Sequence, residues 1–408
     1  MTILFWASLA ALAYVYAGYP LIAGLRARLR PRPVRSAPIE PLVSIMVVAY
    51  NEAERISGRI ENLLALDYPR GRLDIVIASD GSTDGTADRA QAYAAAGVRV
   101  YRFEERRGKA AVINDVVPRL SSEIVVFADA RQRFDAGSLR ALVANFADAS
   151  VGAASGELML ATDGDTATAA RGTAFYWRYE KFIRHSEGLA DSTVGATGAI
   201  YGIRRELFEP IPADTILDDV VIPMRIVRRG YRVIFEPGAR AYDTASATAQ
   251  QEFVRKARTN AGTFQLFSRE RWLLDPRRNR LWFETASHKA LRLTLPLLHA
   301  LVLVSNAVVV WELGVGSWEF ESALYSALLA GQAAFYAAAL VGHARRESRP
   351  LDSARGKRLA FVFSVPCAIC LLSWAAVVGF ARFVTNRQQV TWEKPVAQLP
   401  TSNYQLPT

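Results

Sequence analysis

The chain has few cysteines and histidines, which limits the metal and redox chemistry open to it. Only two of its 408 residues are cysteines, Cys367 and Cys370. Their C-x-x-C spacing falls inside a long apolar run without nearby partner residues, so it indicates packing rather than a metal or redox site. The four histidines are scattered and form no ligand pattern.

A basic stripe interleaved with aromatic residues, typical of a nucleic-acid groove, is also lacking. The net charge is nevertheless +10. The basic residues cluster beside apolar segments, where anionic lipid headgroups would meet them. This pattern predicts membrane lipids as partners and excludes nucleic acid.

No basic residue precedes the first apolar run, at about 3–24. A cleavable signal peptide would carry its charge there, so we expect a retained anchor. Five arginines follow the run, at positions 26, 28, 30, 32 and 35. The positive-inside rule then places the N-terminus outside and residues 26–285 in the cytoplasm.

Long apolar runs are what the chain has in excess, with hydrophobic residues making up 51%. There are four, each roughly 20 residues long and thus able to cross a bilayer: 3–24, 287–311, 321–342 and 359–384. Buried core helices are the alternative, and this length favours membrane.

The loops between the last three runs support segments that cross the membrane out and back. Residues 312–320 carry no Lys or Arg, whereas 345–358 carry six. A fourth crossing would put Arg387 and Lys394 outside, against the charge rule. The alternative is that one C-terminal run is re-entrant or lies in the interface.

Between the first two runs, short apolar segments alternate with helical ones. The segments predicted as strands are Leu42–Tyr50, Leu73–Asp80, Val98–Phe103, Glu123–Asp129 and Val151–Leu160, with helices at 84–96 and 109–117. Such alternation predicts an α/β fold with a mainly parallel sheet covered by helices. Ligands of these sheets bind at the carboxyl ends of the strands.

The block at 165–270 looks less regular. Phe175–Arg184 mixes aromatic and basic residues at helical spacing. This predicts a helix that packs its aromatic face on the sheet or lies at the membrane interface.

We therefore expect one catalytic domain held between membrane segments. The predicted divisions are an anchor at 1–25, a basic linker at 26–41, a cytoplasmic domain at 42–270, a membrane region at 271–386 and a tail at 387–408.

Polar side chains follow the predicted strands where ligands would bind. Asp80 ends the second strand in Ala78-Ser-Asp-Gly-Ser-Thr-Asp-Gly-Thr86, and its glycines permit close approach of a ligand. Arg106-Arg-Gly-Lys-Ala110 places cations at a predicted helix start, which suits phosphate. Asp129 ends the fourth strand, although a lone Asp there is often a helix cap.

Two adjacent carboxylates, Asp218 and Asp219, stand in Ile216-Leu-Asp-Asp-Val220 before a helical run. N-capping alone would explain them. A pair also lets one residue hold geometry while the other accepts a proton. Upstream, Gly195–Arg205 supplies small residues able to line a cleft.

The ordered motifs resemble those of membrane-integrated members of glycosyltransferase family 2, such as poly-N-acetylglucosamine, hyaluronan and cellulose synthases. The resemblance covers about 42–265, the flanking apolar runs and Val390-Thr-Trp-Glu-Lys-Pro395. It implies a GT-A-like fold between one N-terminal and about three C-terminal transmembrane helices.

The resemblance also implies roles for individual residues. Nucleotide binding would fall to Ala49, Tyr50, Asn51, Glu52, Asp80 and Lys109. A divalent cation, Mg²⁺ or Mn²⁺, would bind at Asp129, and the acceptor near Gly195, Gly198 and Arg258. Asp219, beside Asp218, would be the base of an inverting transfer from a nucleotide-sugar, of the UDP type, to a glycan or lipid-linked acceptor.

Two positions depart from the family pattern. Arg131 replaces the second carboxylate of the Asp-x-Asp metal motif, which makes metal dependence less secure. In Arg255-Lys-Ala-Arg-Thr259, the Gln-x-x-Arg-Trp motif keeps only Arg258, and Thr259 replaces the aromatic platform for the acceptor. Addition of one or a few sugars therefore gains weight over processive synthesis, in which partner subunits or a dimer could complete a channel.

Two other classes of function compete with this hypothesis. A catalytically silent membrane protein that binds a nucleotide and regulates a partner has Arg131 in its favour. A transporter is disfavoured because the apolar runs show no internal repeat.

Overall fold

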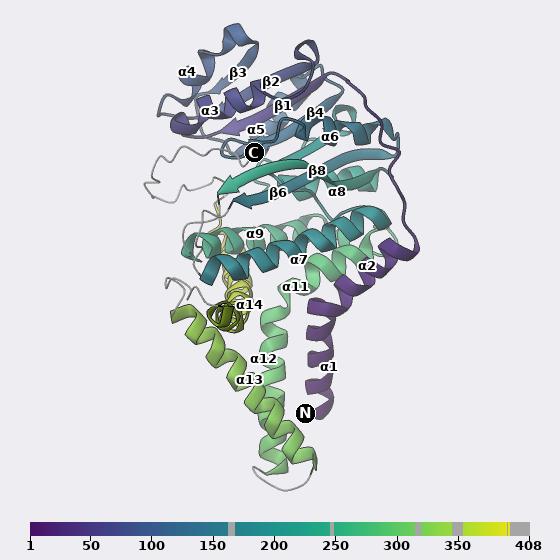
Figure 1. Cartoon of the computed structure of the whole chain (residues 1–408), viewed down its shortest axis with the longest axis vertical. Coiled ribbons are helices and arrows are strands. Elements are labelled where there is room, and N and C mark those ends of the chain that lie inside the picture. Colours follow the sequence, from purple (N-terminus) through teal and green to yellow (C-terminus); the bar gives the residue numbers. More distant parts are fainter. Residues whose placement is uncertain (162–167, 245–248, 315–319, 345–353, 390, 392–408) are drawn as a thin grey trace.

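The chain divides into a sheet-containing part, a layer of helices beneath it and a group of apolar helices (Figure 1). This computed structural model describes residues 1–161, 168–244, 249–314, 320–344, 354–389 and 391. The N-terminus lies at the far end of the apolar group, and the sheet lies at the opposite end of the molecule (Figure 1).

A single eight-stranded sheet organises the upper part. Its strands are β1 (Val43–Ala49), β2 (Leu73–Asp80), β3 (Val98–Phe103), β4 (Ile124–Asp129), β5 (Arg133–Phe134), β6 (Val151–Ala161), β7 (Ile200–Arg204) and β8 (Arg232–Thr244). They lie in the order β3-β2-β1-β4-β7-β6-β8-β5.

The first half of the sheet is parallel and the second half is mixed. Strand β1 pairs in parallel with β2 and β4, and β2 with β3. Strand β7 runs antiparallel to both β4 and β6, whereas β6 and β8 are parallel. The carboxyl ends of β1, β2 and β4 therefore meet at one edge, where parallel sheets bind ligands.

Helices cover both faces of the sheet. They are α3 (Ala53–Leu64), α4 (Thr86–Gln91), α5 (Lys109–Val116), α6 (Ser138–Ala144) and α8 (Asp218–Arg228). Alternate residues of β1 divide between two cores: Ile45 and Val47 pack with residues of α3 and α6, and Met46 packs with residues of α5 and α8. The strands consequently read as continuous apolar runs.

Short helical turns complete the chain. The 3₁₀ turns are Arg70–Arg72, Ala94–Ala96, Val117–Arg119, Asn145–Ala147, Arg205–Leu207 and Arg271–Leu274, and the π-helical turns are Tyr14–Gly18 and Thr285–Ala290.

A helical layer separates the sheet from the apolar helices. It contains α2 (Tyr19–Leu29), α7 (Thr168–Ala190), α9 (Ala249–Arg269), α10 (Trp282–Glu284) and α11 (Leu291–Leu293) (Figure 1). The helix predicted from Phe175–Arg184 is thus confirmed as part of α7. It packs against α2, α14 and β8.

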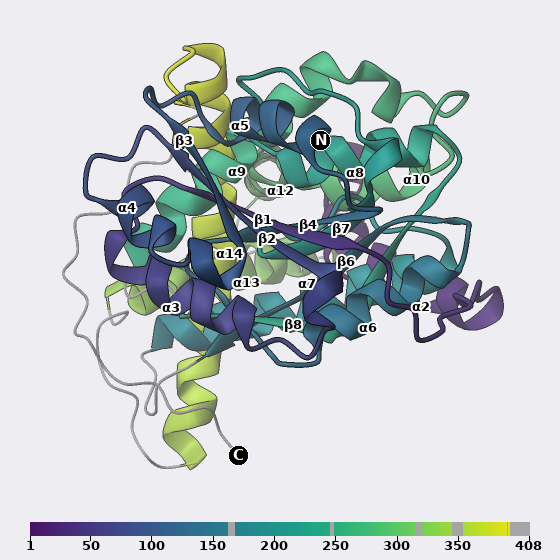
Figure 2. The ribbon, with the colours of Figure 1, turned by 90° about the horizontal axis from the view of Figure 1, so that it is seen from above.

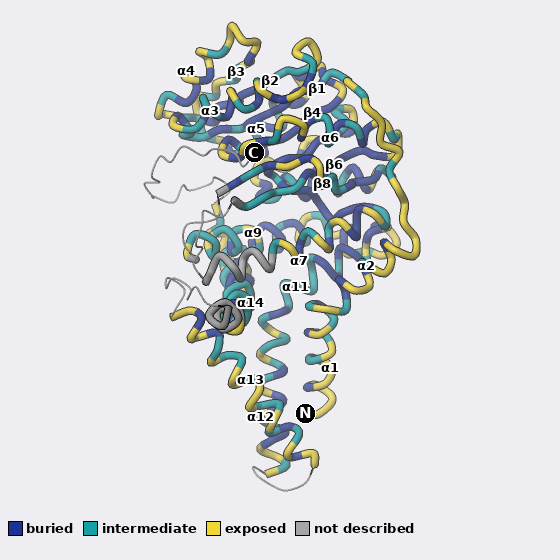
Figure 3. Tube along the Cα trace, in the orientation of Figure 1, coloured by how far each residue is buried: buried dark blue, intermediate teal, exposed yellow. Residues whose placement is uncertain are grey.

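Four stretches are long and apolar enough to cross a membrane: Thr2–Leu29, Leu295–Leu313, Phe320–Ala344 and Val362–Val384. They contain α1 (Thr2–Ala13), α12 (Leu295–Leu313), α13 (Phe320–Ala344) and most of α14 (Ala354–Val384). Residues of α1, α12 and α13 share one apolar cluster around Phe5 and Tyr325. The yellow segments on these helices mark residues that no other part of the chain covers (Figure 3).

Helix α14 runs across the direction of the other apolar helices. Figure 1 looks along α14 but shows α1 and α12 from the side, and Figure 2, turned by 90°, shows α14 from the side. It packs against α9 and α7 in the layer beneath the sheet, and against α13. This arrangement is the one expected if α14 lies along an interface that α1 and α12 cross.

Several predicted boundaries differ in the structure. The second apolar run was placed from residue 287, but the candidate span begins at Leu295, after Lys289 and Arg292, which line a cleft. The block at 165–270 contains two strands, β7 and β8, that were not predicted. The tail motif at 390–395 lies outside the described residues apart from Thr391.

Candidate active site

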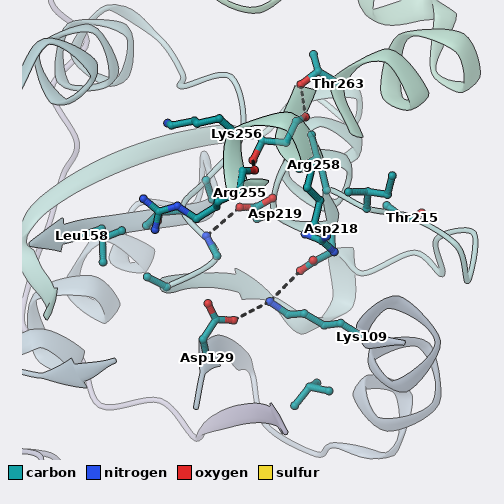
Figure 4. A pocket seen from close by; sticks show the side chains of 18 of the residues that line it. Lys109, Asp129, Leu158, Thr215, Asp218, Asp219, Arg255, Lys256, Arg258 and Thr263 are labelled. Atoms are coloured by element: carbon teal, nitrogen blue, oxygen red, sulfur yellow. Dashed lines mark hydrogen bonds and ion pairs between the residues drawn. The ribbon is translucent and has the colours of Figure 1, made fainter. Parts of the chain in front are cut away.

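An open cleft of about 440 Å³ lies at the carboxyl edge of the parallel strands. Its walls come from the ends of β1, β2 and β4, the start of α5 and α8, and helices α7 and α9 (Figure 4). Nine predicted site residues line it: Tyr50, Glu52, Asp80, Lys109, Asp129, Gly198, Asp218, Asp219 and Arg258. The other three, Ala49, Asn51 and Gly195, are not among the residues that line it.

Asn51 braces the loops instead of lining the cleft. Its backbone has a positive φ of 52°, which asparagine tolerates better than most residues. Its N–H donates to the hydroxyl of Ser82 at 3.1 Å, and its side-chain oxygen accepts from the N–H of Thr83 at 2.8 Å. These bonds tie the loop after β1 to the loop after β2.

Asp80 holds the chain that leads into α5. Its two carboxylate oxygens accept the N–H groups of Arg107 and Gly108, each at 2.8 Å. Gly81 makes this approach possible, because a Cβ at this position would lie 2.4 Å from the backbone nitrogen of Arg106. Arg106 in turn covers the ring of Tyr50, with 3.7 Å from its guanidinium carbon to the ring centre.

Lys109, the first residue of α5, connects the two groups of carboxylates. Its Nζ lies 3.1 Å from Asp129 Oδ1 and 3.4 Å from Asp218 Oδ2 (Figure 4). Burial alone would lower the pKa of the Lys109 ammonium, but Asp129, Asp218 and Asp219 raise it above the ordinary value. Lys109 is therefore a permanent cation at the centre of the cleft.

Asp218 and Asp219 form the first turn of α8. A capping role does not account for them, because the helix begins after Leu217 without a side-chain cap bond. Instead, Asp219 Oδ2 accepts the N–H of Gly198 at 2.9 Å. A Cβ at Gly198 would lie 3.2 Å from that same oxygen, so glycine allows the close approach.

The environment of Asp219 shifts its proton affinity. Burial, and then repulsion by Asp218, raise the pKa of Asp219 to about 6, while Lys109, Arg184 and Lys289 offset part of that rise. The carboxylate is mostly ionised at neutral pH but binds a proton more readily than an ordinary aspartate. This is the property that a general base requires.

Helix α9 presents Arg258 to the carboxylates from the opposite wall (Figure 4). Burial lowers the pKa of Arg258, and Asp218, Asp219 and Asp129 counter that effect. Thr259 lines the cleft, and its hydroxyl donates to the backbone oxygen of Arg255 at 3.0 Å. An aromatic side chain, Trp177 of α7, lines the same cleft although the predicted motif position lacks one.

The position of Arg131 explains how the cleft tolerates it. Its Nε lies 3.2 Å from Asp243 Oδ2 on β8, and the amide of Gln132 donates to the same oxygen at 2.9 Å. No group of three His, Cys, Asp or Glu side chains able to hold a metal occurs among the residues that the structure describes. Asp129, whose side chain is 37% exposed, could hold Mg²⁺ only together with ligands from a substrate such as phosphate oxygens.

Sequence reasoning missed the floor of the cleft on the side of the apolar helices. Glu180 and Arg184 of α7, and His288, Lys289 and Arg292 near α11, line it. The spacing of aromatic and basic residues in α7 could have pointed to Glu180 and Arg184. His288 and Lys289 carried none, because they were counted as the start of an apolar run.

Comparison with known proteins agrees with this architecture. Residues 44–211 match the model of the family described as glycosyl transferase family 2. A mannosyltransferase from Pyrobaculum calidifontis, solved in complex with GDP-Man and Mn²⁺, superposes with a TM-score of 0.68 at 23% identity, covering 94% of this chain and 99% of that one. The GT-A-like fold predicted from the sequence is thereby confirmed.

Curated relatives include poly-beta-1,6-N-acetyl-D-glucosamine synthases. The protein of Staphylococcus aureus (strain COL) is 24% identical over 233 residues, and that of Staphylococcus epidermidis is 23% identical over 237. In both cases the match spans 56% of this chain and 56% of the relative, so it covers little more than half of either protein.

Proposed function

We propose that the chain, whose residues 44–211 match the glycosyl transferase family 2 model, is a glycosyltransferase that performs an inverting transfer at the cleft described above. The donor is a nucleotide-sugar, of the UDP type, and the acceptor is a glycan or lipid-linked hydroxyl. The product belongs to an exopolysaccharide or another cell-envelope glycan. The observation that carries the proposal is the partly buried Asp219, whose pKa of about 6 suits a base, in one cleft with Lys109 and Asp129.

In the proposed reaction, Asp219 accepts the proton of the acceptor hydroxyl. The hydroxyl oxygen then forms a bond to the anomeric carbon, and the bond from that carbon to the nucleoside diphosphate breaks. Gly198 holds the Asp219 carboxylate in place through its N–H. Lys109 supplies a fixed positive charge for the leaving diphosphate.

The other predicted residues fit binding roles. Tyr50, stacked with Arg106, and Asp80, which fixes the following loop, form the part of the cleft proposed for the nucleotide. Asp129 would share a divalent cation, Mg²⁺ or Mn²⁺, with diphosphate oxygens, and such an ion neutralises charge on the leaving group. Gly195 and Arg258 are assigned to acceptor binding because they lie near Asp219.

We place the sheet domain on the cytoplasmic side of a bacterial inner membrane. The arginines that follow the first apolar run support this orientation through the positive-inside rule. In this orientation, nucleotide-sugars reach the cleft directly, and the acceptor reaches it from the membrane side.

Release of nucleoside diphosphate by the purified full chain tests the proposal. The donor panel contains UDP-N-acetylglucosamine, after the names of the curated relatives, and GDP-mannose, after the content of the similarly folded structure. Other UDP- and dTDP-sugars complete the panel, each with Mg²⁺ or Mn²⁺. We expect one donor to turn over in the wild type.

Asp219→Asn is the matched variant for this assay. Loss of a general base should lower the rate by roughly 10²–10⁴-fold, while nucleotide affinity measured by calorimetry stays nearly the same. Equal rates for the variant and the wild type would refute the assignment of Asp219 as the base.

A second function has one observation in its favour. Arg131 occupies the metal-motif position and is committed to Asp243, which is what a silent nucleotide-binding regulator of a partner could tolerate. Nucleotide binding without turnover of any donor, in the presence of membrane lipid extract as acceptor source, would support that function instead.

A further inference from the structure

The cleft extends past Asp219 to a cluster of cations next to the apolar helices. Arg184 of α7, together with Lys289 and Arg292 on the opposite segment, lines this end. Lys289 stands six positions before Leu295, where the candidate span α12 begins, so this end of the cleft would lie at the level of lipid headgroups if α12 crosses the membrane.

The carboxylates of this region are already shared among several donors. Glu180 lies within 3.3 Å of Arg184, 2.7 Å of Arg292 and 3.0 Å of His288. Glu187 accepts from the hydroxyl of Tyr19 and lies 2.7 Å from His288. Both glutamates are almost fully buried, at 4% and 3% exposure.

Lys289 has no such partner: no hydrogen bond or ion pair engages its ammonium within the described part of the chain. Burial lowers the pKa of Lys289 to about 8, Glu180 raises it and the neighbouring Arg184 and Arg292 lower it further. Placing an ammonium in such a site is costly unless an anion completes it.

Lys289 also lines the same cleft as Asp219, the proposed base. The charges of Arg184 and Lys289 act on the Asp219 carboxyl. Lys109 acts on it too, and the Lys109 ammonium contacts Asp129, at the end proposed for the donor. A single molecule can therefore place a hydroxyl at Asp219 and an anionic group at Lys289.

We infer that the acceptor is a membrane lipid that carries its hydroxyl-bearing group through a phosphate, and that Lys289 with Arg184 receives this phosphate. The inference rests on the proposed function and specifies its acceptor. The phosphate is an anchor and not the nucleophile, because Asp219 stands ready to deprotonate a hydroxyl. The lipid chains would leave the cleft toward α12 and α13.

Binding to the full chain in neutral detergent tests the inference with three probes: farnesyl phosphate, farnesol and inorganic phosphate. We expect the wild type to bind farnesyl phosphate more tightly than either of the other two. Lys289→Gln should weaken farnesyl phosphate binding about tenfold or more, since it removes a charge-assisted contact. Lys289→Arg should retain most of the affinity.

Lys181→Gln is the matched control, because it makes the same lysine-to-glutamine change at a side chain of α7 that pairs with Glu157 and does not line the cleft. It should leave farnesyl phosphate binding unchanged. Equal affinity of Lys289→Gln and wild type, or equal losses in Lys289→Gln and Lys181→Gln, would overturn the inference. Inorganic phosphate binding as tightly as farnesyl phosphate would show a site for a free anion and overturn it too.

UDP binding, measured on the same samples, separates this inference from the proposed function. Lys289→Gln should bind UDP as the wild type does, because Lys289 lies away from the proposed nucleotide residues. Failure of the wild type to bind UDP or any other nucleotide would count against the proposed function, whatever the lipid probe shows.

Discussion

The protonation of one residue, Asp219, should set the pH dependence of the reaction. Burial and the neighbouring Asp218 raise its pKa to about 6. A general base works only when it is deprotonated, so, with Asp219 as the proposed base, activity should be fully present above this pKa and should be lost as the pH falls through it. Lys109 stays protonated across the same range because its pKa is raised.

We expect kcat/KM, measured between pH 5 and 8, to fall roughly tenfold per pH unit below about 6. Nucleotide affinity, followed in parallel by calorimetry, should show no matching step. An inflection near the ordinary aspartate value of about 4, or a flat profile, would contradict the assigned environment of Asp219.

The residues of the cleft also show what a sequence reveals about a site. Asp80, Lys109, Asp129, Asp218 and Asp219 were predicted from their places at strand and helix ends, and the structure brings them together in one cleft. The sequence pattern could not reveal which of these side chains contact one another, because each contact joins distant parts of the chain.

Two side chains show where motif reasoning stops. Trp177 reaches the cleft from α7, so the missing motif aromatic at Thr259 does not leave the cleft without an aromatic ring. Asp243, the partner of Arg131, stands on a strand that was not predicted. Whether the enzyme adds one sugar or many therefore does not follow from Thr259 alone.

Among the secondary-structure elements, β1 to β4 were predicted to within one residue. The buried parallel strands β1, β2 and β4 are mostly apolar, and the edge strand β3 mixes exposed arginines with apolar residues. Strand β8 escaped because Pro237 and Gly238 interrupt its apolar pattern at the point where its register with β6 shifts. Strand β7 escaped because it lies in the glycine-rich segment that was predicted to line a cleft.

The packing of helix α14 on α9 yields a prediction at the scale of elements. A Cβ at Gly379 would lie 2.7 Å from the Cβ of Asn260 and 2.9 Å from the backbone oxygen of Ala257. Gly379→Ala should therefore push α14 away from α9, which carries Arg258. We expect a lower melting temperature and about tenfold slower turnover, because catalytic groups tolerate little misplacement.

Gly331→Ala provides the control for this prediction. Gly331 lies in α13, another apolar helix, and no atom would come within 4 Å of an added Cβ. Alanine should be neutral or slightly stabilising there. Equal melting temperatures and rates for the two variants would show that the contact between α14 and α9 is unimportant.

For the whole molecule, the direction of α14 bears on membrane topology. Helix α14 runs across the direction of α1 and α12 (Figures 1 and 2). If it lies along the interface, α1, α12 and α13 would cross and the chain after α14 would stay on the side of the sheet domain. Arg387 and Lys394 then obey the positive-inside rule, which a fourth crossing would violate.

Single cysteines in a chain without Cys367 and Cys370 test this topology. A membrane-impermeant maleimide applied to intact cells should label Glu312→Cys, at the end of α12. It should label Arg70→Cys in the sheet domain, and Gln389→Cys after α14, only when the membrane is opened. Labelling of Gln389→Cys in intact cells would show that α14 crosses the membrane.

The contacts of α2 have a consequence for how the chain is made. Tyr19 bonds to Glu187, 168 residues later, and Arg26 pairs with Glu284, 258 residues later. At synthesis rates of ~5–20 residues per second, the first helix leaves the ribosome roughly ten to fifty seconds before Glu284 exists. During synthesis the first helix therefore has an interval in which the side chains of Tyr19 and Arg26 lack these partners. The interval ends only when the segment that carries Glu284 has been made.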